Sequence, residues 1–390
     1  MIRKKRPVFI LLLMSVLIAL PLVLTGYASA DLLSEAIAQA PVGTETGEID
    51  PTAEPGYLGI PGAIQINLLV GFLWAVWVGW IFSTVGAFGG IMAGVGHITI
   101  FGIGRYAGEF RQTAPMLNRV LTDSVRVSNQ FLVGMSALIS SFNYYRLGRL
   151  VLPLGLALAF GSIFGSYLIP WLTAGKISFR EYLGYFGMFV LALGIVMLYE
   201  TTPRGRAKKK EAKKAADAFE ATMKRQRSGE KIDTSQLGVK VTSITLKRFT
   251  FTFYGVEFSF NPFYPVIGGF IIAAISSFIG VGGGFLLVPF LTSISGLPMY
   301  LSAGTSAFAV LVGMIISIFS YLQQGVIVHW PLIGIELVGI VVGSIIGPRT
   351  SQYIPDLWLK RLFIILAFYV GIDYVLRGFV GKGIIALLGF

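Results

Sequence analysis

The chain has 390 residues, 55% of them hydrophobic and 13% charged, and a mean hydropathy of +0.76, which together exclude a soluble globular protein. Cysteine is absent and histidine occurs twice, so disulfides and thiolate sites are excluded and we expect neither a metal nor a cofactor. The net charge of +12 is concentrated in residues 3–6 and 201–250, a distribution that predicts membrane topology and argues against a nucleic-acid partner.

The amino-terminal region has the pattern of a targeting segment. Residues 1–30 combine a basic start, an apolar run over 8–24 and the small residues Ala28-Ser29-Ala30, which is typical of a secretory signal peptide. An uncleaved signal anchor is the alternative, because the apolar run is long enough to span a bilayer. In both cases residues 31–60 lie outside, and their acidic, proline- and glycine-containing composition predicts a flexible acidic extracytoplasmic segment.

Residues 61–200 are predicted to form the first membrane repeat. The stretch 55–104 contains no Asp, Glu, Lys or Arg, so it has room for two crossings of about 20 residues each, joined at a glycine cluster over 86–90. A re-entrant hairpin at those glycines is the alternative. Three further apolar segments follow, at 125–145, 150–171 and 181–199.

Residues 201–260 form a basic loop that we place in the cytoplasm. Within it, 208–226 has the composition of a helix, and 239–260 alternates polar with apolar residues, as expected of a hairpin that turns near Tyr254-Gly255. Residues 261–390 are then the second membrane repeat. Its apolar segments lie at 263–279, 285–295, 301–322, 326–346 and 358–376.

The second repeat resembles the first in sequence as well as in hydropathy. GSIFGSYLIP at 161–170 aligns with GIVVGSIIGP at 339–348, and the glycine cluster at 86–90 aligns with the one at 280–284. With 31–60 outside and 201–260 inside, each half must cross the membrane an odd number of times. We therefore predict an all-α polytopic membrane protein of two inverted repeats with glycine-broken helices, either discontinuous or re-entrant.

The sequence IGVGGGFLLVPFL at 279–291 is the strongest candidate for a site. Three consecutive glycines followed by Pro289 break a helix at membrane depth, and transporters use such breaks to bind solutes. The half-helix that begins there presents unpaired N–H groups and a partial positive charge, which attract anions. Close helix packing is the alternative role for glycines, and we prefer it for Gly339, Gly343 and Gly347.

Polar side chains near the two breaks complete the predicted substrate site. Its residues are Gly89, Gly90, His97, Arg126, Ser128 and Asn129 in the first half, and Gly282, Gly283, Gly284, Thr305 and Ser306 in the second. Arg126 either assists anion binding or snorkels to the interface. His97 either donates to the anion, relays a proton or makes a structural hydrogen bond. Glu336 and Asp373 are further candidates for proton coupling.

The stretch GVGGGFLLVPFL, followed by AGTSAF, resembles the signature of the TauE/SafE sulfite exporter family, also called the 4-toluene sulfonate uptake permease family. The resemblance implies a transporter that moves sulfite, organosulfonates or related small anions across the inner membrane. By position it also implies binding elements at the glycines of both breaks and at the serine, asparagine and threonine positions given above. The first half departs from the pattern, with Phe88 opposite Gly282 and Val95 opposite Pro289.

The sequence therefore predicts a secondary transporter, multi-pass in the inner membrane, that moves a small sulfur-containing oxyanion by alternating access, with protons as a candidate coupling ion. It contains no hydrolase, phosphate-loop or metalloprotease motif, so we do not expect an enzyme. The alternative is a non-transporting membrane scaffold or sensor that recruits a partner through the basic loop. No pattern specifies an oligomeric state.

Overall fold

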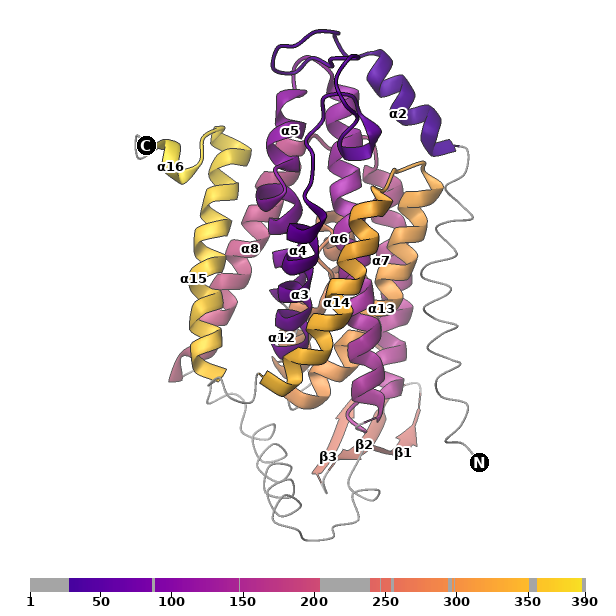
Figure 1. Cartoon of the computed structure of the whole chain (residues 1–390). Coiled ribbons are helices and arrows are strands. Elements are labelled where there is room, and N and C mark those ends of the chain that lie inside the picture. The colour runs from indigo at the N-terminus through magenta and orange to yellow at the C-terminus, as the bar shows by residue number, and fades with distance from the viewer. Residues whose placement is uncertain are drawn as a thin grey trace.

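The computed structural model describes residues 28–85, 88–146, 148–203, 239–245, 247–253, 256–293, 297, 299–350 and 356–387. It is a bundle of helices with a small sheet at one end (Figure 1). Helix α2 (Ala28–Ala38) and the short helix α16 (Ile384–Leu387) lie at the opposite end from the sheet. Residues 1–27 of the predicted targeting segment over 1–30, and the predicted helix over 208–226, lie outside the described residues.

The helices of the first half follow the predicted apolar segments. They are α3 (Leu68–Val85), α4 (Phe88–Val95), the π-helical η2 (Gly96–Ile100), α5 (Ile103–Glu109), α6 (Pro115–Arg146), α7 (Leu152–Thr173) and α8 (Phe179–Thr201). Helix α6 begins ten residues before the apolar segment predicted from residue 125. The apolar pattern missed its first turns because they carry polar side chains such as Asn118 and Thr122. Both side chains are buried and hydrogen-bonded within the bundle, where a polar group needs such a partner.

The second half has a similar order of long helices, although its described residues include no counterpart of α5 between α12 and α13. It contains α11 (Phe263–Ile279), α12 (Gly284–Ser293), α13 (Met299–Gln323), α14 (Trp330–Thr350), α15 (Asp356–Val375) and the π-helical η5 (Leu376–Val380). Among the described residues, four helices are long and apolar enough to cross a membrane: Leu152–Thr173, Phe179–Tyr199, Leu301–Gln323 and Trp330–Gly347. The helices next to the glycine clusters are shorter, and α12 has 10 residues, fewer than the roughly 20 that a crossing needs.

The helices of the two halves pack against each other in a reciprocal pattern. The first helix of each half packs on a long helix of the other half, since α3 packs on α14 and α11 packs on α7. The aligned glycine motifs make both contacts possible. A Cβ on Gly343 of α14 would overlap the Val76 carbonyl of α3, and one on Gly161 of α7 would overlap the Val266 carbonyl of α11. Gly339 and Gly347 also face α3, which confirms the packing role preferred for them.

The sheet at the end of the bundle is three-stranded and antiparallel, in the order β1 (Lys240–Ile244), β2 (Phe249–Phe253) and β3 (Val256–Phe260). Phe253 lies opposite Val256, which confirms the predicted hairpin around residues 254–255. Alternate phenylalanines of β2 are buried, and Phe251 stacks on Phe258 with ring centroids 5.4 Å apart. The prediction lacked the third strand, β1.

Residues 31–60, expected to be flexible, differ from that expectation. Helix α2 is followed by a chain that folds over the end of the bundle, and Tyr57 and Ile60 are buried in it. The hydroxyl of Tyr57 is 2.9 Å from the Ser124 hydroxyl of α6. Acidic composition suggested disorder, but a few apolar side chains inserted between helices are enough to order the segment.

Candidate functional site

The two glycine breaks lie against each other inside the bundle. A Cβ on Gly90, at the start of α4, would overlap the carbonyl oxygen of Val281 in the second break. Gly280 and Gly282 have φ values of +79° and +71°, which side-chain-bearing residues rarely adopt. Gly280 ends α11, with its N–H donating to the Ser276 carbonyl at 2.7 Å. The glycines therefore allow both the chain reversal and the close contact between the halves.

The remaining predicted glycines pack closely against their own half. A Cβ on Gly89 would meet Phe82 of α3 at 2.5 Å, and one on Gly283 would meet the Ser276 hydroxyl of α11 at 2.8 Å. Gly284, the first residue of α12, has more room, because a Cβ added there would lie 3.6 Å from the Val310 side chain. Each broken segment is thus held against the helix that precedes it.

His97 lies on η2, directly after the first break, and is fully buried. Its Nδ1 is 2.7 Å from Oδ1 of Asn129 and 3.1 Å from the Ala93 carbonyl. Both of these oxygens accept hydrogen bonds, so Nδ1 carries a hydrogen and donates it. The other ring nitrogen, Nε2, then faces Glu336 of α14 at 3.3 Å. The protonation state of Nε2 therefore decides whether this contact is an ion pair.

Glu336 is fully buried, and neither of its carboxylate oxygens has a hydrogen-bond partner within the described residues. The His97 Nε2 lies 3.3 Å from one of these oxygens, which is close enough for an ion pair. An unsatisfied buried carboxylate is costly, so such a group usually binds a proton, water or ligand in use. Sequence reasoning identified Glu336 but gave it no partner.

A chain of polar contacts continues from His97 to the second break. Nδ2 of Asn129 donates to the Tyr182 hydroxyl at 3.4 Å, and that hydroxyl donates to the Ile279 carbonyl at 2.9 Å. Ile279 is the last residue of α11, directly before Gly280. Asn129 therefore connects the first break to the second, as its place in the predicted site requires.

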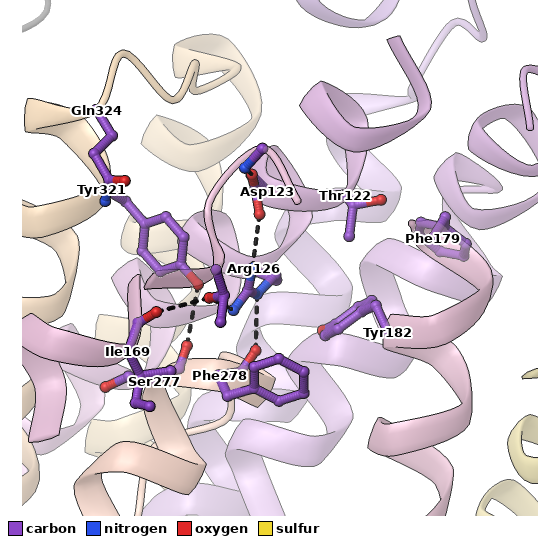
Figure 2. A network of polar contacts seen from close by, with 12 residues as sticks. Thr122, Asp123, Arg126, Ile169, Phe179, Tyr182, Ser277, Phe278, Tyr321 and Gln324 are labelled. Atoms are coloured by element: carbon purple, nitrogen blue, oxygen red, sulfur yellow. Dashed lines mark hydrogen bonds and ion pairs between the residues drawn. The ribbon is translucent and has the colours of Figure 1, made fainter. Parts of the chain in front are cut away.

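Arg126 lies on the other side of the second break, and Figure 2 shows Asp123, Tyr321 and Phe278 around its guanidinium. It donates to Oδ1 of Asp123 at 2.8 Å, to the Phe278 carbonyl at 2.7 Å and to the Thr173 hydroxyl at 2.9 Å. The guanidinium also lies 5.0 Å from the ring centroids of Phe278 and Tyr321.

This arrangement corrects one alternative for Arg126. Its side chain is completely buried, so it does not snorkel to an interface. The Asp123 carboxylate compensates its charge, and Asp123 also accepts the Gly175 N–H at 2.6 Å. Through the Phe278 carbonyl, the pair fixes the end of α11 just before the glycines. Asp123 was missed from the sequence, although an acid three residues before an arginine on one helix is a recognisable pair.

The serine and threonine candidates are less closely connected to the breaks. Ser128 and Thr305 are buried, but the Thr305 hydroxyl accepts from the Val151 N–H at the start of α7. The Ser306 hydroxyl donates to the Ala303 carbonyl of its own helix. The hydrogen bonds of Thr305 and Ser306 thus serve helix ends and turns, and do not join them to His97 and Asn129. Tyr182, which completes the polar chain, carried no signal in the sequence.

Comparison with known proteins matches residues 69–374 to the family model described as sulfite exporter TauE/SafE. The chain belongs to the TauE/SafE sulfite exporter family. In keeping with its apolar helices, this TauE/SafE member is a multi-pass membrane protein. The resemblance seen in the glycine stretch is therefore confirmed.

One curated relative is described as a probable membrane transporter protein of Methanocaldococcus jannaschii. It is 36% identical over 115 residues, which cover 28% of this TauE/SafE chain and 43% of the relative. The chain thus spans less than half of the length of the curated relative it matches. No solved structure matches the chain.

Proposed function

We propose that this TauE/SafE member is a secondary transporter of a small sulfur-containing oxyanion, such as sulfite or an organosulfonate, across the inner membrane by alternating access. The observation that carries the proposal is the contact between the two glycine breaks, with a buried polar chain from His97 to Ile279 linking them. Broken helices that meet inside a membrane protein are the usual construction of a transporter site.

The oxyanion would lie between the breaks once one repeat has moved against the other, because in this conformation the Val281 carbonyl fills the space at Gly90 and the Val133 side chain fills that at Gly282. Asn129 and His97 offer side-chain N–H groups next to this position, and the start of α12 offers main-chain N–H groups. Arg126 acts through the Phe278 carbonyl, which sets the position of the second break. Thr305 and Ser306 stay predicted ligands.

Alternating access would follow from two inverted repeats that move relative to each other. Two observations support this part of the proposal. The interhelical contacts are reciprocal, and the first half starts at the α2 end and ends near the sheet, whereas the second half runs back to the α2 end (Figure 1). Rocking one repeat against the other would expose the shared site to each side in turn.

We also propose that His97 and Glu336 bind the coupling proton. With a hydrogen fixed on Nδ1, the pair holds one further proton either on Nε2, as imidazolium and carboxylate, or on Glu336, as imidazole and carboxylic acid. Gaining or losing a proton changes the charge beside the anion position by one unit. Tyr57 and Tyr182 are described titratable side chains near this pair, and Arg126 and Asp123 lie across the second break.

Purified protein in liposomes tests the transport proposal with sulfite, thiosulfate, taurine, sulfoacetate and phosphate as a panel. We expect at least one sulfur oxyanion to enter faster than into empty liposomes. A variant that lacks 208–226 should keep that flux, because the site lies in the bundle. If no anion of the panel moves in either gradient direction, the chain is not this kind of transporter. That outcome would instead favour the non-transporting scaffold alternative.

A further inference from the structure

A second site-like feature is a cavity of about 820 Å³ at the end of the bundle that carries α2. It lies between η2 and α5 on one side and the start of α8 and η5 on the other. Among the described residues, its lining includes four arginines and no aspartate or glutamate: Arg105, Arg111, Arg180 and Arg377. Its size falls within the range of small-molecule sites, roughly 300–1,000 Å³.

Nearby carboxylates balance part of this positive charge, since Glu181 lies close enough to Arg111 for their charges to attract. Arg377 pairs with Asp373 at 2.7 Å, but Arg180 donates only to the main-chain carbonyls of Gly378 and Phe379. No ion pair joins Arg105 or Arg111 to a carboxylate within the described residues. The cavity therefore has a net positive charge and N–H donors that could face a ligand.

The arginines also lie where the rule for membrane topology favours few basic residues. The charge pattern places the α2 end outside, whereas lysine and arginine are concentrated in cytoplasmic loops. A basic cavity at that end is thus not explained by topology. A role in binding an anion explains both the charge and its place.

Residues that line the cavity lie next to the proposed transport site. Thr99, two residues after His97 on η2, lines the cavity, and its hydroxyl is 2.6 Å from the Tyr374 hydroxyl. Phe101 also lines the cavity and lies edge-on to the His97 ring, with centroids 5.5 Å apart. Only the residues of one π-helical turn separate the two sites.

We propose that this cavity binds an oxyanion, and that Arg105, Arg111 and Arg180 form an extracytoplasmic capture site in front of His97. The capture role rests on the proposed transport function, whereas the binding itself does not. A free solute anion and the headgroup of an anionic lipid share the required chemistry, and we assign the site to the free anion.

Equilibrium binding of sulfite to the full chain in phosphatidylcholine nanodiscs tests the site without any transport. The variant R105Q/R111Q removes two exposed charges, which should leave the fold intact, and R119Q removes an exposed charge at the same end but outside this cavity. We expect R105Q/R111Q to weaken the cavity's sulfite binding about tenfold and to reduce its salt dependence, and R119Q to leave both unchanged. Equal binding by wild type and R105Q/R111Q would overturn the proposal.

Two further arms separate the alternatives. In nanodiscs that contain phosphatidylglycerol, sulfite binding should stay within about twofold of that in phosphatidylcholine; its loss there would assign the cavity to a lipid headgroup and overturn the proposal. In liposomes, R105Q/R111Q should raise the KM for sulfite added outside and leave kcat unchanged, since electrostatic capture precedes the transport step. Arginine-dependent binding without any flux would leave the cavity site intact and contradict only the transport function.

Discussion

At the scale of single residues, the interior of the bundle contains charges whose positions depend on each other. Asp123 and Arg126 are both buried, and each has a second anchor, the Gly175 N–H and the Phe278 carbonyl. Removing one member of a buried pair leaves the other uncompensated, which costs about 3–5 kcal/mol. The first prediction concerns this pair.

The variant D123N keeps an acceptor for Gly175 but removes the negative charge. We expect a clear fall in the thermal unfolding midpoint of the purified protein, in line with a loss of about 3–5 kcal/mol. D123N/R126M, which removes both charges, should be less destabilised than D123N. If D123N unfolds at the wild-type temperature, the pair does not hold the second break in place.

A second prediction at this scale concerns Glu336, whose carboxylate oxygens have no hydrogen-bond partner within the described residues. E336Q keeps the shape of the side chain but cannot exchange a proton with His97 at 3.3 Å. We expect E336Q to keep exchange of sulfite for sulfite across liposomes and to lose accumulation driven by a pH gradient. E257Q, in strand β3 and outside the bundle core, is the control and should keep both activities. Gradient-driven accumulation by E336Q at the wild-type rate would exclude this residue as the proton site.

At the scale of elements, the glycine breaks fix how α4, α11 and α12 meet. Gly280 combines a φ of +79° with the Arg126 carbonyl 2.7 Å from its ideal Cβ. G280A should therefore destabilise the protein by about 1–3 kcal/mol and reduce sulfite flux, because the strained backbone must move away from α6. The control is G334A in α14, where nothing lies within 4 Å of the added Cβ. It should be as stable as wild type or up to about 1 kcal/mol more stable. Equal melting curves for G280A and G334A would contradict this role.

The contact between residues 31–60 and the start of α14 gives a pH prediction, because Tyr57 lies against His329 there. His329, just before α14, lies with its ring centroid 5.1 Å from that of Tyr57, and burial lowers its pKa below the usual 6.5. The folded state therefore disfavours the protonated ring. This contribution to stability is complete above pH 6.5 and is lost as the pH falls through the lowered pKa.

Melting curves of wild type and H329Q separate this effect from that of other groups. They are recorded from about pH 4 to about pH 8, which covers the range in which histidine titrates. We expect the difference in unfolding midpoint between wild type and H329Q to shrink as the pH falls below 6.5. An advantage that grows on acidification would reverse the sign and contradict the assigned burial of His329.

At the scale of the whole molecule, the sequence was sufficient for the long apolar helices and the family, but it did not predict α2 or α5. Charge-free apolar runs of about 20 residues are typical of membrane helices, and the aligned glycines indicated which segments correspond. The contact of Gly90 with Val281 agrees with that correspondence. The hairpin at 254–255 followed from alternation of polar and apolar residues.

The partners of the buried polar groups were not predictable in the same way. His97 and Glu336 are neighbours because α14 packs beside α3 and α6, and no local period encodes that packing. Tyr182 is one of several tyrosines in apolar segments, and only the fold brings it to Asn129. The acidic composition of 31–60 suggested flexibility, whereas Tyr57 and Ile60 are buried through contacts that form only in the folded bundle, such as that of Tyr57 with Ser124.

The most direct test of the central claim is sulfite counterflow in liposomes that contain the purified wild-type protein. Liposomes loaded with unlabelled sulfite are diluted into a trace of labelled sulfite, and the label inside is followed over time. A site between two broken helices that opens alternately to each side predicts transient accumulation of label above its equilibrium level. Label that rises only to equilibrium, or that does not enter at all, would contradict an alternating-access sulfite transporter.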